Sequence, residues 1–254
     1  MVHTDDHPCR GCGLSCGVTG DYCLDSYSCC TGYTCGYTNV CVADYGECGW
    51  SRSECEGAGG YFYNGCCDRD GDSPVLVDTA GDGLSLTDAA GGVYFDLSGG
   101  GAPKRLAWTE PDSDDAWLAL DRNGNGRVDD GTELFGNFTT QPTPPAGIGV
   151  NGFNALAVYD QPAQGGDSDG VLDSRDRIFS SLRLWRDANH NGVSEPGELR
   201  TLSALGLTSI DLDYKESRRR DHYGDRFRYR AKVGDARGAQ MGRWAWDVFL
   251  TSAP

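Results

Sequence analysis

The sequence has few basic residues and no long apolar run. Its 254 residues include 38 acidic and only 22 basic side chains, for a formal charge of −16. Nucleic-acid phosphates need basic grooves, so this acidity argues against a nucleic-acid partner. No apolar run is long enough to span a membrane. A signal-peptide core is also missing before Cys9, and we expect a mature form whose leader has been removed.

The usual catalytic motifs are missing as well. The chain contains no Gly-x-Ser-x-Gly, His-Glu-x-x-His or phosphate-loop sequence. Among its 4 histidines, His190 is expected to point to solvent and His222 to lie in a charged turn. We therefore expect no enzymatic activity. A hydrolase that uses paired carboxylates or calcium is the less favoured alternative.

Cysteine is absent beyond Cys67, although the chain has 12 cysteines. An even number packed into a short segment predicts a disulfide framework, which forms in an oxidising environment, so we expect a secreted, extracellular protein. Residues 1–67 hold too few apolar side chains for a core of their own, and disulfides must stabilise them. The sequence thus predicts a cystine-rich domain over residues 1–72 and a second domain over residues 73–254.

The second domain contains a complete calcium-binding loop. Residues 187–198 match the pattern D-x-[DN]-x-[DN]-G-x5-E at every constrained position. Calcium takes about six to eight oxygen ligands, and this spacing turns acidic and amide oxygens toward one point while Gly192 permits the sharp turn. The expected ligands are Asp187, Asn189, Asn191, the Val193 carbonyl, Glu195 and Glu198.

A second loop, residues 121–133, departs from the pattern at its end. Position twelve is Thr132, and Glu133, one residue later, is expected to close the site through a slightly enlarged loop. The other expected ligands are Asp121, Asn123, Asn125, the Arg127 carbonyl and Asp129.

A third loop departs from the pattern at its start. Counting back from its later ligands places Gly165, which has no side chain, at position one. Asp160 fills that place if residues 161–166 bulge out. The remaining expected ligands are Asp167, Asp169, Val171, Asp173 and Asp176.

Two fragments look like decayed relatives of these loops. Residues 78–83 keep positions one, five and six, and Asp96 is the only retained carboxylate of the other fragment. For both, an Asp/Gly turn between strands is favoured over a full site. In all we expect about two to four calcium ions. Residues 68–214, which contain the loops, carry 25 acidic and 10 basic residues, so the metal-free form should be loosened by repulsion.

The cysteine spacing of residues 16–41 resembles that of an inhibitor cystine knot (knottin). The adjacent pair Cys29 and Cys30 and the gaps around it fit that family. The resemblance implies the pairs Cys16–Cys30, Cys23–Cys35 and Cys29–Cys41. No pairing is assigned to Cys9, Cys12, Cys48, Cys55, Cys66 and Cys67.

The expected fold class is α+β: a small knottin-like domain followed by a strand-rich domain with short helices and EF-hand-like loops. Alternating apolar residues predict strands at 75–77, 94–97, 118–121, 182–185 and 209–214, and a terminal hairpin at 226–233 and 241–250. Short helices are expected at 151–159, 174–182 and 196–205. The loops would then join strands to helices.

Short sequence blocks over residues 73–254 carry a second resemblance. They include Ser73-Pro-Val-Leu-Val-Asp78, Leu118-Ala-Leu-Asp-Arg-Asn-Gly-Asn-Gly126, Asp130-Gly-Thr-Glu-Leu-Phe-Gly136 and Leu182-Arg-Leu-Trp-Arg-Asp187. In this order they resemble the calcium-binding module of secreted bacterial RTX-type (haemolysin-related) proteins, and are similar to the self-processing module of iron-regulated RTX proteins. The glycine-rich nonapeptide repeats of RTX β-rolls are missing.

The self-processing module uses calcium to cut an Asp-Pro bond. This chain has Ser73-Pro74 at the matching place and no Asp-Pro dipeptide anywhere. We therefore expect no self-cleavage, and a product split before Pro74 after calcium addition would contradict this expectation.

The favoured function is a secreted, calcium-binding structural or adhesive protein, in which calcium makes the second domain rigid. A subunit of an extracellular filament or surface assembly is one version, and a cell-surface or glycan partner is another. The alternative is an inhibitor or toxin role for the knottin-like domain on a calcium-stabilised carrier. Asn137 begins a glycosylation sequon, whose use depends on the host.

Overall fold

The computed structural model describes residues 72–144, 149–236 and 243–253 with their side chains, and only the backbone of five short strands before them. The chain divides into two compact units, Met1–Asp70 and Gly71–Pro254. The first unit contains β1 (Tyr33–Cys35), β2 (Cys41–Ala43), β3 (Glu47–Cys48), β4 (Tyr61–Tyr63) and β5 (Cys66–Asp68). β1 pairs with β2, and β5 lies between β3 and β4. The knottin-like arrangement and the cysteine pairs lie outside the described residues.

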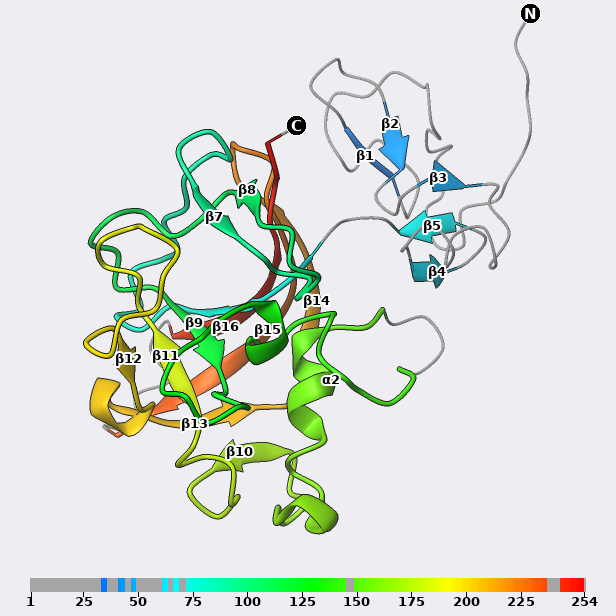
Figure 1. Ribbon diagram of the computed structural model, residues 1–254. Helices are drawn as coiled ribbons and strands as arrows, with labels where there is room; N and C mark the ends of the chain where they lie inside the picture. Colours follow the sequence, from blue (N-terminus) through cyan, green and yellow to red (C-terminus); the bar gives the residue numbers. More distant parts are fainter. Residues whose placement is uncertain are drawn as a thin grey trace, which may run out of the picture. The chain divides into compact units, whose positions relative to one another are not determined.

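The second unit is built on one nine-stranded sheet. Its strands are β6 (Val75–Val77), β9 (Ala116–Ala119), β10 (Val171–Asp173), β11 (Arg183–Trp185), β12 (Leu199–Arg200), β13 (Leu207–Asp211), β14 (Lys215–Arg220), β15 (Arg226–Asp235) and β16 (Trp244–Phe249). Eight follow the order β10-β13-β15-β16-β6-β9-β11-β12, and β14 pairs with β15. Every pairing is antiparallel, and the sheet curls on itself (Figure 1). A separate hairpin joins β7 (Val93–Phe95) to β8 (Lys104–Leu106).

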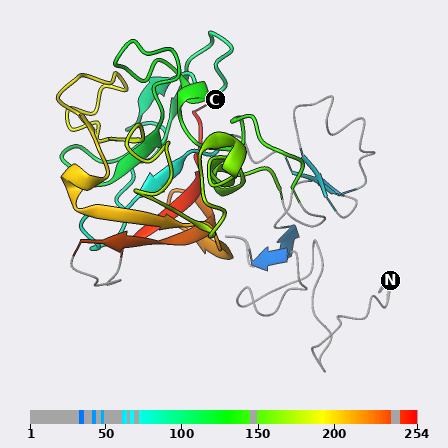
Figure 2. The same ribbon diagram turned by 90° about the horizontal axis from the view of Figure 1, so that it is seen from below.

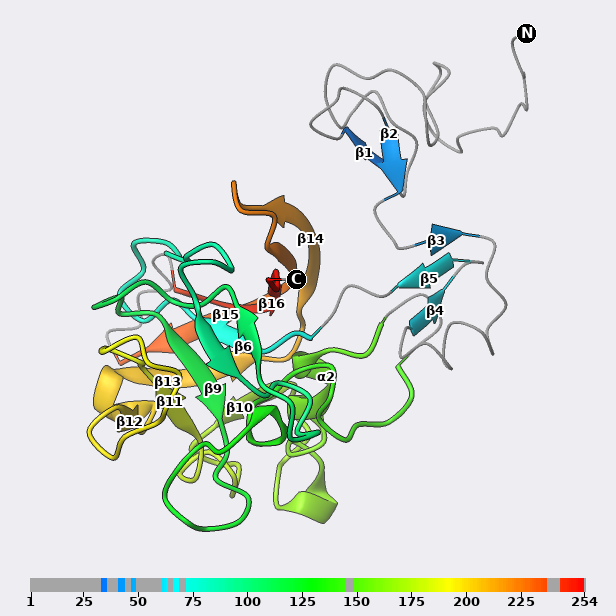
Figure 3. The same ribbon diagram turned by 45° about the horizontal axis from the view of Figure 1, so that its top comes forward.

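The neighbours in the sheet come from distant parts of the chain. Figure 2 shows β13, β15 and β16 side by side at one end of the order. β6, β9 and β11 are adjacent near the other end (Figure 3). Two of the three loops expected to bind calcium start just beyond β9 and β11, and β10 lies within the third. The sheet therefore holds the start of two loops and a central part of the third in place.

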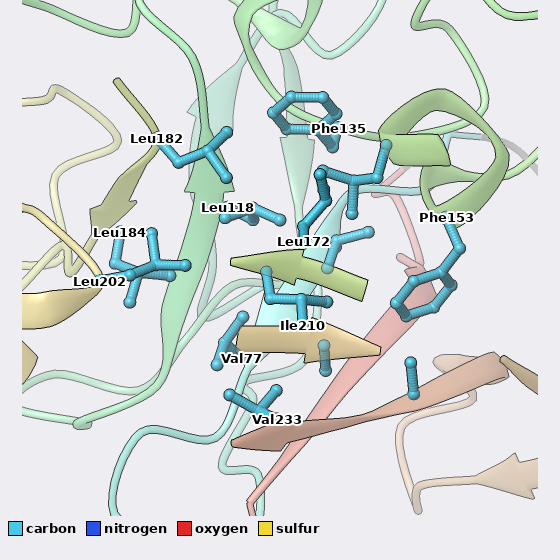
Figure 4. Packing of buried hydrophobic residues seen from close by; sticks show 14 of the residues in the cluster. Val77, Leu118, Phe135, Phe153, Leu172, Leu182, Leu184, Leu202, Ile210 and Val233 are labelled. Carbon is cyan, nitrogen blue, oxygen red and sulfur yellow. The ribbon is translucent and has the colours of Figure 1, made fainter. Parts of the chain in front are cut away.

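Both faces of the sheet are covered, because alternate side chains enter two hydrophobic clusters. On β6, Val75 and Val77 enter the first cluster and Leu76 the second. The first cluster contains the side chains labelled in Figure 4, among them Leu118, Phe153 and Ile210. Strands buried on both faces read as continuous apolar runs, which explains the Val-Leu-Val sequence of β6.

The second cluster is centred on aromatic rings. The Trp108 ring centroid lies 4.6 Å from that of Trp117, 5.5 Å from that of Trp185 and 5.3 Å from that of Phe95. The three indoles are completely shielded from solvent. Rings at such distances add to the stabilisation that burial provides. The loop of residues 187–198 begins two residues after Trp185, a member of this cluster.

The expected α+β class is wrong. Within the described residues the one α-helix is α2 (Gly152–Ala157), accompanied by the 3-10 turns η2 (Gly131–Glu133), η3 (Pro162–Gln164) and η4 (Ser203–Leu205). The helix expected at 151–159 is confirmed over six residues, capped by Asn151, whose side chain accepts from the backbone N–H groups of Phe153 and Asn154. The second unit is a curled antiparallel sheet with long loops.

The other two expected helices do not form. After residue 174 the chain forms successive turns, with Phe179 N–H bonded to the Asp176 carbonyl and Ser181 N–H to that of Ile178. In the 196–205 segment, Leu199 is drawn into pairing with Trp185, which makes β12 instead of helix. A helix of so few residues gains too little from its own hydrogen bonds to resist such competition.

The expected strands are confirmed with shifted ends, including the terminal hairpin of β15 and β16. Its pairing has a register shift between Phe227 and Tyr229. Alternation alone would place these two rings on one face, yet Phe227 enters the second cluster and Tyr229 the first. A β-bulge of this kind redirects the following side chains to the other face.

Candidate metal centre

The three loops share one arrangement at their first and sixth positions. The sixth residue is a glycine with positive φ in each: Gly126 at 82°, Gly170 at 83° and Gly192 at 71°. Its backbone N–H donates to the first aspartate, over 2.7 Å to Asp121, 3.1 Å to Asp160 and 2.8 Å to Asp187. Left-handed backbone favours glycine, so the sequence pattern and the turn require each other. The seventh residues, Arg127, Val171 and Val193, directly follow these glycines.

The closing carboxylate is bound in the same way in the first and second loops. In residues 187–198, Glu198 accepts from the N–H of Ala188 at 3.0 Å and of Glu195 at 3.3 Å. These are the second and ninth positions of the loop. The carboxylate therefore lies across the loop from Asp187, where a closing ligand is required.

Glu133 has the corresponding contacts in residues 121–133. It accepts from the N–H of Arg122 and from that of Asp129, each at 2.9 Å. These donors again hold the second and ninth positions, although Glu133 lies one residue later than the pattern prescribes. Its neighbour Thr132 instead donates to Asp130, which caps the short turn η2. The extra residue is absorbed in that turn.

The ninth-position acids are held by amide side chains. Asp129 accepts from the amide nitrogens of Asn123 at 2.8 Å and Asn125 at 2.6 Å. Glu195 accepts from those of Asn189 at 3.4 Å and Asn191 at 3.0 Å. These hydrogen bonds lower the pKa of both acids below their ordinary values. In both loops the amide side chains at the third and fifth positions thus contact the acid at the ninth position.

The third loop is closed by an excursion of the chain. Residues 161–166 leave and return, with Gly165 at φ 88° and Gly166 packed so closely on Asp160 that a Cβ would lie 2.2 Å from its carbonyl carbon. Asp160 consequently occupies the first position of the loop, where the sequence predicts it. Asp176 accepts from Asp173 N–H at 2.8 Å, which repeats the bond between the closing carboxylate and the ninth residue.

Carboxylates converge in this third loop with buried oxygens left over. Ligand atoms of Asp160, Asp167 and Asp169 lie within 4.8 Å of one another. Asp160 and Asp176 are 5% and 3% exposed, and one oxygen of each, Oδ1, has no hydrogen-bond partner. Burial raises the pKa of Asp176, and the charges of Asp160, Asp167 and Asp173 raise it further. This donor set of hard oxygens fits calcium chemistry.

A guanidinium lies among the exposed acids of the same loop. Arg175 pairs with Asp167 at 3.0 Å, with Asp173 at 2.7 Å and with Asp169. Its hydrogen bonds lower the pKa of Asp173. Where the other two loops have Asn at the third and fifth positions, this loop has Asp167 and Asp169, and the arginine offsets part of the added charge.

The loops are tied to the body of the domain. Trp108 donates its indole N–H to Asp187 at 2.9 Å, from the centre of the aromatic cluster. The ring nitrogens of His190 lie 2.7 Å from the Thr109 carbonyl and 2.8 Å from that of Gly91. The loop position of His190 suggests a ring that points to solvent, and that expectation is wrong. The ring instead fastens the loop to two neighbouring segments.

The structure also brings together acids that no spacing predicts. Asp78 and Asp82 share a cluster with Asp114, which belongs to a distant segment. The Asp96 fragment forms a small exposed turn, in which Asp96 accepts from Ser98 Oγ and Gly101 N–H. The sequence signal that could have pointed to Asp114 is the pair of acids at 114–115, just before a buried strand.

Ser73 and Pro74 lie at the entrance to β6. Ser73 N–H donates to Asn137 Oδ1 at 2.9 Å, and Asn137 N–H donates to the Ser73 carbonyl at 3.2 Å. The absence of self-cleavage remains a prediction. In the described ranges, no helix has the length and apolar character needed to cross a bilayer.

Comparison with known proteins places the second unit in a family. The family model of the SPM domain matches residues 75–250. The chain is also 37% identical over 145 residues to the iron-regulated protein FrpA of Neisseria meningitidis serogroup C. That match covers 56% of this chain and 12% of FrpA, so the chain spans a small part of this curated relative. Because the family model matches more than half of its residues, the chain belongs to the SPM domain family.

Proposed function

We propose that the second unit is a calcium-binding module in which ions fix the loops of residues 121–133, 160–176 and 187–198 on the curled sheet. The observation that carries the proposal is the pair of buried, partnerless carboxylate oxygens in the third loop, Asp160 Oδ1 and Asp176 Oδ1. A buried charged oxygen is costly unless it is paired or coordinates a metal. The repeated geometry of the three loops extends the proposal to all of them.

Calcium is favoured over other cations by the donor set. Carboxylate, amide and carbonyl oxygens are hard ligands, whereas zinc and copper prefer nitrogen and sulfur. Magnesium demands near-octahedral geometry and keeps several waters, while calcium accepts six to eight ligands in flexible arrangements. Loops of about twelve residues with a bidentate closing glutamate match the preferences of calcium.

The module is proposed to act as a rigid extracellular scaffold and not as an enzyme. Trp108 and His190 fasten one loop to the core and to neighbouring segments, which suits a permanently filled site. Extracellular calcium fills even sites with dissociation constants of about 10⁻⁴–10⁻³ M. Membership of the SPM domain family and the likeness to part of FrpA support a secreted, RTX-related protein.

Thermal unfolding of the metal-free protein tests the proposal. Calcium should raise Tm, and magnesium at equal concentration should raise it less, because a ligand that binds only the folded state stabilises it. Asp160→Asn should reduce the calcium-induced rise by removing one charge from the third loop. Asp213→Asn, at an exposed acid that pairs with Lys215, is the matched control and should leave the calcium-induced rise unchanged. An equal Tm with and without calcium would contradict the proposal.

Self-association into a filament or surface assembly is a further part of the proposal. Bound ions would reduce the repulsion between acidic loops of neighbouring copies. Light scattering at increasing calcium concentrations tests it, and a constant molecular mass at every concentration would count against assembly. The alternative inhibitor or toxin role belongs to the cystine-rich unit, whose side chains lie outside the described residues.

A further inference from the structure

A fourth acidic group lies where β6 ends and β9 begins. Asp78 directly follows β6, and Asp114 and Asp115 directly precede β9, which pairs with β6. Ligand atoms of Asp78, Asp82 and Asp114 lie within 4.8 Å of one another. Asp78 is only 3% exposed, Asp114 is partly buried and Asp82 is exposed, so the cluster reaches from the core to the surface.

The backbone around Asp78 repeats the turn of the three loops. Asp78 accepts from Gly81 N–H at 2.6 Å and from Gly83 N–H at 3.0 Å. Gly83 is the sixth residue counted from Asp78 and has φ 113°, as the equivalent glycines have positive φ. The local turn is thus already that of a cation-binding loop, although its third residue, Ala80, offers no side-chain ligand.

Asp114 compensates for Ala80 from a distant part of the chain. Its Oδ2 accepts from Ala80 N–H at 2.6 Å and from Thr79 Oγ1 at 3.1 Å, and its backbone carbonyl accepts from Thr79 Oγ1 at 2.7 Å. The carboxylate therefore lies beside the second and third positions of the loop.

Asp115 supplies the observation that points to a ligand. It is 1% exposed, and its Oδ1 has no hydrogen-bond partner. Its Oδ2 accepts from Ser85 N–H at 2.9 Å and from Ser113 Oγ at 2.8 Å. This buried oxygen belongs to the residue that follows Asp114 in the chain, directly before β9.

We propose that Asp78, Asp82, Asp114 and Asp115 bind a fourth divalent cation, calcium by its donor chemistry, at a site assembled from two distant segments. Carboxylates gathered beside a buried, partnerless oxygen are costly unless a cation offsets their charge, and an ion would supply that charge. The ion joins the end of β6 to the start of β9 and so locks the middle of the sheet. This site does not depend on the three loops.

Counting bound ions by native mass spectrometry of the full chain tests this site. Asp114→Asn and Asp82→Asn should each bind one calcium ion fewer than the unmodified protein at the same free calcium. Asp112→Asn is the matched control, because Asp112 lies two residues away, is exposed and is not in the cluster. It should retain the full count. An unchanged count in both test variants would overturn the proposal.

A second variant separates this site from the proposed function. Asp121→Asn, Asp160→Asn and Asp187→Asn combined weaken the three loops and leave the fourth site intact. If this variant keeps one ion that is lost on adding Asp114→Asn, the fourth site stands. If instead the unmodified protein binds a single ion and loses it through Asp114→Asn, the three-loop proposal fails while the fourth site survives. Loss of no ion through Asp114→Asn in either background rejects the site.

Discussion

Ser194 joins the loop of residues 187–198 to the loop of residues 121–133 through Val128. Its hydroxyl accepts from Val128 N–H at 2.7 Å and lies 3.2 Å from the Val128 carbonyl, to which it donates. Both residues hold the eighth position of their loops, and both are buried. This contact links the two loops directly.

This contact predicts cooperative calcium binding. Ser194→Ala leaves the buried Val128 N–H without its partner, which should lower the free energy of unfolding by about 1–3 kcal/mol. It should also make binding to the two loops less cooperative, as measured by the Hill coefficient in a calcium titration. Ser203→Ala, in the exposed turn η4, serves as control. An unchanged Hill coefficient in Ser194→Ala would show that the contact does not couple the loops.

The hydrogen bond from Trp108 to Asp187 predicts an optical signal. The carboxylate of Asp187 accepts the indole N–H of Trp108, and calcium would bind to that same carboxylate. The electrostatic environment of Trp108 should therefore change when calcium binds. Tryptophan fluorescence should shift on calcium addition, and Trp108→Phe should remove most of the shift. Trp244→Phe, a partly exposed indole in β16, should preserve it. A shift that persists in Trp108→Phe assigns the signal to another indole.

Arg175 should compete with calcium in the third loop. Its guanidinium pairs with Asp167, Asp169 and Asp173, three of the expected ligands. Arg175→Gln should therefore bind calcium several-fold more tightly at this loop, while the metal-free variant unfolds at a lower temperature. Arg218→Gln, at an exposed position of β14, is the control, and calorimetry measures both. Weaker binding in Arg175→Gln would mean that the arginine helps to shape the loop.

The buried Asp247 predicts a pH dependence of stability in the metal-free protein. Burial raises its pKa to about 7, although the Gly152 N–H, Ser73 and Arg228 oppose the shift. The folded state then holds a proton that the unfolded state releases from about pH 4 upward, so stability falls as the pH rises from about 4 to 7. Above about pH 7 both states are ionised and this loss is complete.

Asp247→Asn removes that contribution, since an amide keeps an acceptor for Gly152 N–H and does not ionise. The Tm of this variant should exceed that of the unmodified protein more at pH 8 than at pH 4.5, with calcium removed by chelator. Asp213→Asn is again the exposed control. Parallel Tm curves for Asp247→Asn and the unmodified protein would contradict the assignment.

Local features were predictable because their causes are local. The loop of residues 187–198 has all its expected ligands in one regular spacing. The second loop reaches Glu133 through one extra residue in a short turn, and the third reaches Asp160 through the excursion of residues 161–166. Strands were predicted by alternation and by the short apolar run of β6. In each case the chain itself brings the interacting groups together.

Features that depend on distant segments could not be predicted. Asp114 meets Asp78 because β6 pairs with β9, and no spacing along the chain encodes that pairing. The expected helix at 196–205 gave way to pairing of Leu199 with Trp185, a tertiary contact that overrides weak helical preference. The bulge between Phe227 and Tyr229 likewise follows from the partner strand and not from alternation.

The central claim is that calcium braces this module, and calorimetric titration of the chelator-treated protein with calcium tests it most directly. The account predicts saturable binding of several ions, about one for each of the three loops and one for the Asp78 cluster, together with a higher Tm. An absence of binding heat up to millimolar calcium, with an unchanged Tm, would contradict the account and reduce the loops to acidic turns.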